Sequence, residues 1–394
     1  MLKLIPTLLC VFALLSACSS LPKTNQPNNL QLARAQQGLN VYGQAIAKPL
    51  NLISNDDVLY LSEDAKQALF KHVNPKWRSS HKYRALIDWL KSGEQTLMLY
   101  RNDYTRTAMQ TIRHGVGNCL SLTAVFYAYA KALNLNVQFN HVKVPPRWQI
   151  SESQKTFLRY DHVNAKVILP FHGVEYVDFS AENFHPTMPM RTLSENAFKA
   201  LFFANRSIEY MVQDDVLLAF RHGLAAVNLD PHNSNLWNNL ATLYRRLGHH
   251  DLAEISYQQA IHLSPSNIVA WSNLAFLYRD KGDIEKAQEI DELANPYRNN
   301  NPYYLAWKAQ NAKKKGQLSL AMRSLKRAIQ LKSDVHFFYH QLASIQVENQ
   351  DLAAALRNYR KALRLTDQPA YREHYIEQQA ELEKRLQQST SHRL

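Results

Sequence analysis

Alanine recurs every 34 residues through the C-terminal half of the 394-residue chain, and this period restricts the fold more than any other feature of the sequence. Gly248, Gly282 and Gly316 keep the same step. Small residues at fixed steps let the two helices of a hairpin, and then the next hairpin, approach closely. The period therefore predicts an all-α solenoid over residues 196–390. The alanines form three series: Ala219, Ala253, Ala287, Ala321 and Ala355; Ala226, Ala260, Ala294, Ala328 and Ala362; and Ala241, Ala275, Ala309 and Ala343.

The repeating unit resembles the tetratricopeptide repeat, since Trp237 and Trp271 also recur at this step. The resemblance implies four clear repeats, a degenerate one from about Ala200, and a capping helix near residues 370–388. Such solenoids present a concave groove to an extended protein segment, so we expect a protein partner there. The two tyrosines among the candidate groove residues are favoured as core residues instead. These candidates are Asn238, Asn239, Tyr244, Arg245, Asn273, Tyr278 and Arg279.

A second informative segment, predicted to form a buried helix, is residues 115–133, GVGNCLSLTAVFYAYAKAL. Its apolar residues follow the spacing of a helix that buries one face. Cys119 falls on the first turn, where unpaired N–H groups and the helix dipole favour an anion. Because the thiolate is the nucleophilic form of cysteine, we interpret Cys119 as a candidate catalytic residue. Most single cysteines are buried core residues, and position alone leaves that alternative open.

The N-terminus has the pattern of a secretory signal, and its ending LSAC resembles that of bacterial lipoproteins. The resemblance implies that residues 1–17 are removed, that Cys18 is lipidated, and that residues 18–30 tether the protein to the outer membrane, facing the periplasm. Ordinary cleavage, which gives a soluble periplasmic protein, is the alternative. Cys10 would be removed, which leaves Cys119 as the free thiol of the mature chain. In an oxidising compartment, chemistry explains an unpaired thiol better than packing does.

Charge and motif spacing narrow the partners further. The formal net charge of +13 suits an acidic partner or a lipid surface. No dense run of Lys and Arg with interleaved aromatic residues occurs, so nucleic acid is not expected. No CxxC or HExxH spacing supports a metal site, and we expect neither a metal nor a cofactor.

Residues 31–195 combine helical and strand patterns. Helices are expected from Ser62 to Pro75, from Ser80 to Gly93 and from about Gln95 toward Ile112. After Leu133 the period changes to that of strands, with strand-like residues between Val137 and Val144.

Residues 162–169 and 174–179 are predicted to form an antiparallel hairpin. This pairing brings His162 and Asp178 to the same end, on a polar edge. A simple turn leaves the two residues out of direct opposition, so we expect a bulge or a longer turn to align them.

The segments GNCLSLTAVFYAYAKALNLN, DHVNAKVIL and EYVDFS resemble the three catalytic motifs of the bacterial transglutaminase-like domain. The resemblance covers about residues 60–190 and implies a papain-like α+β fold. It also implies that Cys119 is the nucleophile, that His162 is the general base and that Asp178 orients the imidazole. Asn118 and Asn164 are the candidate oxyanion or supporting residues. The latter replaces an aromatic residue that many members carry, which leaves the substrate and the acceptor undetermined.

Thiolate attack on an amide carbonyl forms a thioester and divides one difficult step into two. We therefore expect a lipid-anchored thiol enzyme that transfers or hydrolyses acyl groups on a protein or peptide, with hydrolysis favoured and the repeats recruiting substrate or partner. One alternative is a non-catalytic assembly lipoprotein with a degenerate enzyme fold. Another is an amidase that acts on cell-wall peptides.

Overall fold

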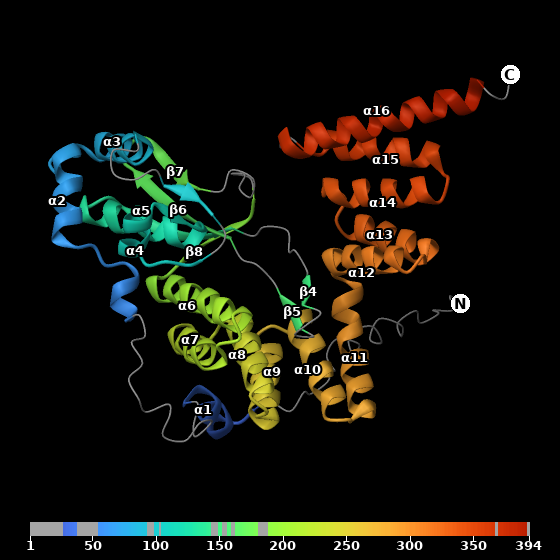
Figure 1. Cartoon of the computed structure of the whole chain (residues 1–394), viewed down its shortest axis with the longest axis horizontal. Coiled ribbons are helices and arrows are strands. Elements are labelled where there is room, and N and C mark those ends of the chain that lie inside the picture. Colours follow the sequence, from blue (N-terminus) through green and yellow to red (C-terminus); the bar gives the residue numbers. More distant parts are fainter. Residues whose placement is uncertain are drawn as a thin grey trace, which may run out of the picture.

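The computed structural model describes residues 27–37, 54–92, 98–101, 104–142, 149–151, 156–158, 162–179, 188–366 and 369–391 (Figure 1). The expected signal of residues 1–17 and the expected lipid site Cys18 lie outside the described residues. An α+β part is followed by a stack of helical hairpins that continues to the C-terminus. Among the described helices, none has the length and the apolar character needed to span a membrane.

Two of the three helices expected early in the chain are confirmed. The helix α2 (Glu63–His72) begins after Ser62, whose hydroxyl accepts the backbone N–H of Ala65 at 3.3 Å. The helix α3 (Ser79–Ser92) follows. A short 3-10 helix, η2 (Asn55–Val58), precedes both and lies near the first helix of the repeats.

The third expected helix, from about Gln95 toward Ile112, is wrong at the described residues 98–101 and 104–107, which are not helical. Leu99–Tyr100 form the strand β1, which pairs in parallel with β2 (Val116–Gly117). The helix α4 (Ala108–His114) begins only after Thr107, which forms a capping box with Gln110. This reciprocal pair of bonds satisfies two backbone donors at the helix start and so fixes the boundary there.

Within residues 115–133, the predicted helix is α5 (Cys119–Ala132), which packs against β3, β6 and the helices α2 to α4. Every residue from Cys119 to Ala130 is buried. The expectation that this helix buries only one face is therefore too narrow, because neighbouring elements surround it.

The α+β part contains a four-stranded antiparallel sheet with the order β7-β6-β3-β8. The helices α5 and α6 meet on this sheet, where the ring of Phe139 stacks between Tyr127 and Phe198, each at a centroid distance of 3.8 Å. A separate two-stranded hairpin of β4 and β5 lies beside the repeats, where β5 is near α10 (Figure 1). The strands are β3 (Val137–Val142), β4 (Gln149–Ser151), β5 (Thr156–Leu158), β6 (His162–Leu169), β7 (Gly173–Val177) and β8 (Met190–Leu193).

The C-terminal part forms five helical hairpins and a final helix, as the 34-residue period indicates. None of the fourteen alanines in the three series is more than 1% exposed, so small residues do occupy the helix contacts. The helices are α6 (Glu195–Val212), α7 (Val216–Leu229), α8 (Ser234–Arg246), α9 (His250–Leu263), α10 (Ile268–Asp280), α11 (Ile284–Asn299), α12 (Pro302–Lys314), α13 (Leu318–Leu331), α14 (His336–Glu348), α15 (Leu352–Arg364) and α16 (Pro369–Ser391).

The turn within each hairpin uses a left-handed backbone at one fixed position. Gly248, Gly282 and Gly316 have φ values of 78°, 79° and 71°. Asp214 and Gln350 occupy the same step of the repeat, with φ values of 63° and 62°. Because a side chain is unfavourable in this conformation, the first and last hairpins carry backbone strain that the glycines avoid in the others.

The hydrophobic core is divided between α11 and α12. One continuous cluster joins the α+β part to the first three hairpins and ends at Ala294, and a second begins at Leu305. The first cluster includes Ala35 of the helix α1 (Asn29–Gln37), which lies against α7 and α9. Its carbonyl oxygen accepts the hydroxyl of Tyr244 at 2.7 Å.

Candidate active site

His162 and Asp178 meet at the end of the β6–β7 hairpin. The ring Nε2 of His162 lies 2.7 Å from Oδ2 of Asp178. The strands keep a regular register in which Ala165 faces Val177, so Asp178 lies one step further, opposite Asn164. His162 is the diagonal neighbour on the same face, and a long side chain spans that distance. The expected bulge or longer turn is therefore unnecessary.

This end of the hairpin is buried rather than a polar edge. His162 is 4% exposed and Asn164 is fully buried. The amide nitrogen of Asn164 donates to Oδ2 of Asp178 at 3.0 Å, and its carbonyl oxygen accepts from Asn140 at 2.9 Å. Asn164 thus holds the carboxylate against the histidine ring. Asn140, which the sequence patterns did not single out, supports it from β3.

The second partner of the His162 ring is the thiol of Cys119, at the start of α5. Asp178 occupies Nε2, which leaves Nδ1 as the ring nitrogen available to the thiol. Burial lowers the pKa of His162, but the hydrogen bonds with Asp178 and Cys119 and the electrostatic interactions with both groups outweigh burial and raise it to about 9. At neutral pH the ring is therefore an imidazolium that is held between a carboxylate and a sulfur atom.

Asn118 caps the helix that carries Cys119. Its carbonyl oxygen accepts the backbone N–H of Ser121 at 3.0 Å, and its amide nitrogen donates to the hydroxyl of Thr105 at 2.7 Å. The side chain of Asn118 is only 3% exposed, so it supports the start of α5 structurally. The backbone N–H of Cys119 is at the first helical position, where a helix provides no acceptor, so it is the donor that fits an oxyanion.

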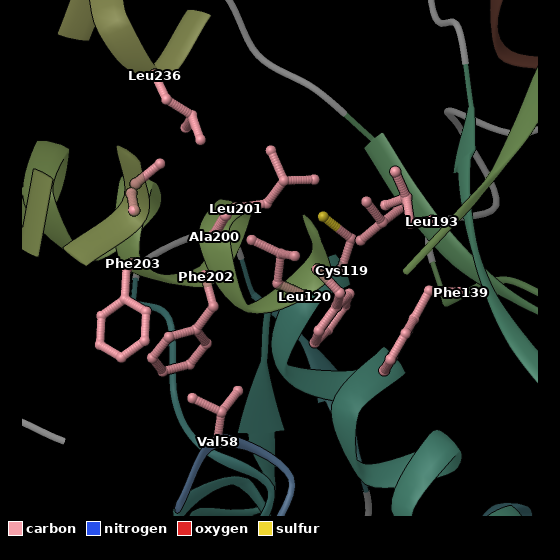
Figure 2. Packing of buried hydrophobic residues seen from close by; sticks show 14 of the residues in the cluster. Val58, Cys119, Leu120, Phe139, Leu193, Ala200, Leu201, Phe202, Phe203 and Leu236 are labelled. Atoms are coloured by element: carbon pink, nitrogen blue, oxygen red, sulfur yellow. The ribbon is translucent and has the colours of Figure 1, made fainter. Parts of the chain in front are cut away.

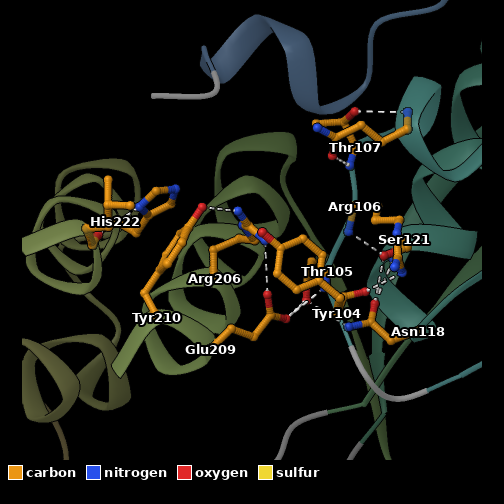
Figure 3. A network of polar contacts seen from close by, with 12 residues as sticks. Tyr104, Thr105, Arg106, Thr107, Asn118, Ser121, Arg206, Glu209, Tyr210 and His222 are labelled. Carbon is orange, nitrogen blue, oxygen red and sulfur yellow. Dashed lines mark hydrogen bonds and ion pairs between the residues drawn. The ribbon is translucent and has the colours of Figure 1, made fainter. Parts of the chain in front are cut away.

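The support of α5 continues into the repeats through buried polar contacts (Figure 3). The carboxylate of Glu209, on α6, accepts bonds from both the backbone N–H and the hydroxyl of Thr105. Arg206 pairs with Glu209 at 3.3 Å, and its guanidinium lies 3.9 Å from the ring centroid of Tyr104. Burial raises the pKa of Glu209, while the bonds from Thr105 and Arg206 oppose that rise. None of these residues carried a pattern that marked it as part of the site.

Two glycines shape the approach to Cys119. Gly115 ends α4 with a φ of 66°, a left-handed conformation that suits glycine. A Cβ atom at Gly117 would lie only 2.6 Å from Cβ of Ser121 and 3.2 Å from Cγ2 of Thr111. The second glycine is therefore required by close packing.

A cleft lies where the α+β part meets the first repeats. Leu120 and Val163, which follow Cys119 and His162 in the chain, line one side. Residues of α6, α8 and α10 line the remainder, including Leu201 and Leu236. In Figure 2 the sulfur atom of Cys119 lies on the side of α5 that faces Leu201. The cleft is thus shared by the α+β part and the first repeats.

The candidate groove residues divide into buried and accessible ones. Tyr244 and Tyr278 are at most 1% exposed, in agreement with the interpretation of both as core residues. Asn273 is fully buried and donates to Oδ1 of Asn238 at 2.9 Å. Asn239 is half-buried and lines the cleft. The two arginines form ion pairs: Arg245 with Asp280, and Arg279 with Asp291.

No group of three or more His, Cys, Asp and Glu side chains suited to a metal ion occurs within the part of the chain that the structure describes.

Comparisons with known proteins concern the repeats. Tetratricopeptide-repeat family models match residues 222–255, 256–289 and 338–369. No curated protein matches the sequence significantly.

Similar solved structures include a tetratricopeptide-repeat protein of Thermus thermophilus, with 18% identity over 46% of this chain and 98% of that one, and a TM-score of 0.28. They also include pilF of Pseudomonas aeruginosa, with 13% identity over 49% and 87% of the two chains, and a TM-score of 0.30. The protein spans about a third of a chain of the APC/C hetero-tetramer Cut9-Hcn1, with 19% identity over 42% of this chain and 34% of that chain, and a TM-score of 0.26.

The family models and the regular burial of the alanine series identify the C-terminal half as a tetratricopeptide-repeat solenoid. Repeats of this class are protein-interaction modules, because each hairpin adds to a continuous binding surface. The C-terminal half is therefore a surface for binding other proteins.

Proposed function

We propose that this protein is a transglutaminase-like, papain-like thiol hydrolase that cleaves amide bonds in a polypeptide substrate bound with the help of its repeats. The observation that carries this proposal is the position of the His162 ring, which bonds to Asp178 through Nε2 and also interacts with Cys119. A buried imidazole between a thiol and a carboxylate has the arrangement of a nucleophilic triad.

In the first step the sulfur anion of Cys119 attacks the carbonyl carbon of the amide. The carbonyl electron pair moves to oxygen, where the backbone N–H of Cys119 stabilises it. As the C–N bond breaks, the imidazolium of His162 donates its Nδ1 proton to the leaving amine. A thioester on Cys119 and a neutral His162 remain.

In the second step a water molecule attacks the thioester. Neutral His162 now accepts the proton from this water through Nδ1, and the C–S bond breaks to give a carboxylic acid and the thiolate. Asp178 keeps Nε2 protonated and holds the ring plane in place throughout. Water is the acceptor that we favour, because the residues lining the cleft include no carboxylate to bind the ammonium group of an acceptor amine.

The proposed location is the periplasmic face of the outer membrane, with Cys18 as the lipid anchor. The support for this location is the sequence LSAC after an apolar run. An anchored enzyme with a long repeat surface is suited to a protein substrate or partner in that compartment.

Two experiments test the proposed chemistry. Iodoacetamide should alkylate Cys119 rapidly at pH 6.5, and His162→Ala should slow alkylation, whereas His172→Ala at the exposed turn histidine should not. The periplasmic proteins of wild-type and Cys119→Ala strains should then differ in their N-termini. A slowly labelled thiol with identical proteomes would reject the enzyme and leave a repeat scaffold.

A further inference from the structure

We propose that the cleft beside Cys119 is a substrate subsite shared by both parts of the protein, and that it binds an extended, uncharged polypeptide segment through its main chain. This inference rests on the proposed function and specifies its substrate. The cleft begins at Leu120 and Val163, the residues next to the thiol and the imidazole, and continues to α8 and α10. Leu201 also lines the cleft, and the sulfur atom of Cys119 lies on the side of α5 that faces Leu201 (Figure 2), so a segment lying in the cleft would run from the repeats toward that sulfur.

Four of the residues that line the cleft are asparagines, and every other lining residue has an apolar side chain. Carboxamides donate and accept hydrogen bonds without charge, as the main chain of a peptide does. A charged side chain that entered this cleft would lose water without gaining an ionic partner from the lining residues, which is unfavourable. The chemistry of the lining thus favours main-chain recognition of uncharged sequences. The four residues are Asn205, Asn235, Asn238 and Asn239.

Two of these asparagines are arranged to donate to a ligand. The carbonyl oxygen of Asn235 accepts from Asn267 at 3.2 Å, and that of Asn239 accepts from Asn238 at 3.2 Å. Asn238 is fixed in turn by Asn273 of the next repeat, at 2.9 Å. Because the carbonyl oxygens of the first two residues are already bonded, their amide nitrogens are the groups presented to a ligand.

The spacing of these donors fits an extended chain. Asn235 and Asn239 are four residues apart on α8 and share one face of that helix, about 5–6 Å apart. Carbonyl groups on one side of an extended strand recur at every second residue, about 6.6 Å apart. The two amides therefore match two carbonyl oxygens of a single bound strand.

The test uses two thiol reagents on the full-length protein. Acetyl-Ala-Gln-Ala-Gln chloromethyl ketone must occupy the cleft to alkylate Cys119, with chloride as the leaving group, whereas iodoacetamide needs only the thiol. Asn235→Asp and Asn239→Asp keep the bonded oxygen and replace the donor nitrogen. Each should slow the peptide reagent about three- to tenfold and leave the iodoacetamide rate unchanged. Asn295→Asp, at an exposed position on α11, is the matched control.

Several results would overturn the subsite. The first is that the variants and the wild type react with the peptide reagent at equal rates. The second is that the variants react more slowly with both reagents. The third is that the wild type reacts faster with a peptide reagent that carries Glu in place of Gln. Anisotropy of a fluorescent acetyl-Ala-Gln-Ala-Gln-amide bound to Cys119→Ser gives an independent measurement that needs no thiol. If Asn235→Asp weakens binding in the Cys119→Ser background, the subsite is supported. An inert thiol in the wild type would then reject the enzymatic activity but not the subsite. Unchanged binding rejects the subsite.

Discussion

Glu209 of the first repeat helix accepts two hydrogen bonds from Thr105, at 2.7 Å from its backbone N–H and 2.6 Å from its hydroxyl. The same hydroxyl accepts from Asn118, which caps the helix that begins with Cys119. The solenoid therefore helps to hold α5 in place through three side chains.

Glu209→Ala should destabilise the protein by about 1–3 kcal/mol, because it leaves the donors of Thr105 without a partner. Glu209→Gln retains an acceptor oxygen and should cost less. Urea unfolding measures both changes. The exposed Glu292→Ala is the control and should have little effect. Equal stability of Glu209→Ala and wild type would show that the contact with Thr105 does not matter.

Asp178→Asn should lower the pKa of His162 from about 9 toward or below its ordinary value, since the carboxylate is the first of the groups that raise it against burial. The asparagine still provides an oxygen for the amide of Asn164, so the fold should persist. NMR titration of the imidazole nitrogens measures the change. An unaltered titration would mean that Asp178 does not control the ring.

The pH dependence follows from the same pKa. The Nδ1 proton of His162 is present below about pH 9 and is lost above it. Hydrolysis of acetyl-Ala-Gln-Ala-Gln p-nitroanilide should therefore fall as the pH rises through about 9, because the leaving amine needs that proton. The matching p-nitrophenyl ester, whose leaving group needs no proton, should keep its rate. A fall of both rates together would contradict the assignment of His162 as the proton donor.

Gln350→Gly should stabilise the last hairpin by about 0.5–1 kcal/mol, since glycine adopts a φ of 62° without steric cost. The reciprocal change, Gly316→Ala, should destabilise its own hairpin by a similar amount. Thermal unfolding of both variants against the wild type measures these effects. A lower melting temperature for Gln350→Gly would show that the glutamine side chain contributes more than the strain costs.

The repeats were readable from the sequence because each hairpin is stabilised by local contacts at one fixed step. The three alanine series mark the helix contacts directly, and their burial confirms them. The strands of the β6–β7 hairpin were readable for a similar reason, because alternation over residues 162–169 is a local signal. Their register was not, since a diagonal contact between His162 and Asp178 depends on side-chain reach.

Long-range contacts were beyond the sequence patterns. Glu209 and Thr105 are 104 residues apart, and nothing near either one indicates the other. The same is true of Ala35, which packs against the repeats and accepts from Tyr244 although it precedes the α+β part. The expected helix from Gln95 failed because pairing of Leu99 with Val116 competes with helix formation there.

The division of the hydrophobic core between α11 and α12 should affect how the protein unfolds on heating. The surroundings of Cys119 share one apolar interior with the first three hairpins, whereas the buried residues of the last two hairpins and α16 form three smaller clusters. Because these clusters are small, heating should release the C-terminal hairpins before the first three. The α+β part and the first three hairpins, which carry Cys119 and the asparagine-lined cleft, should by contrast unfold together.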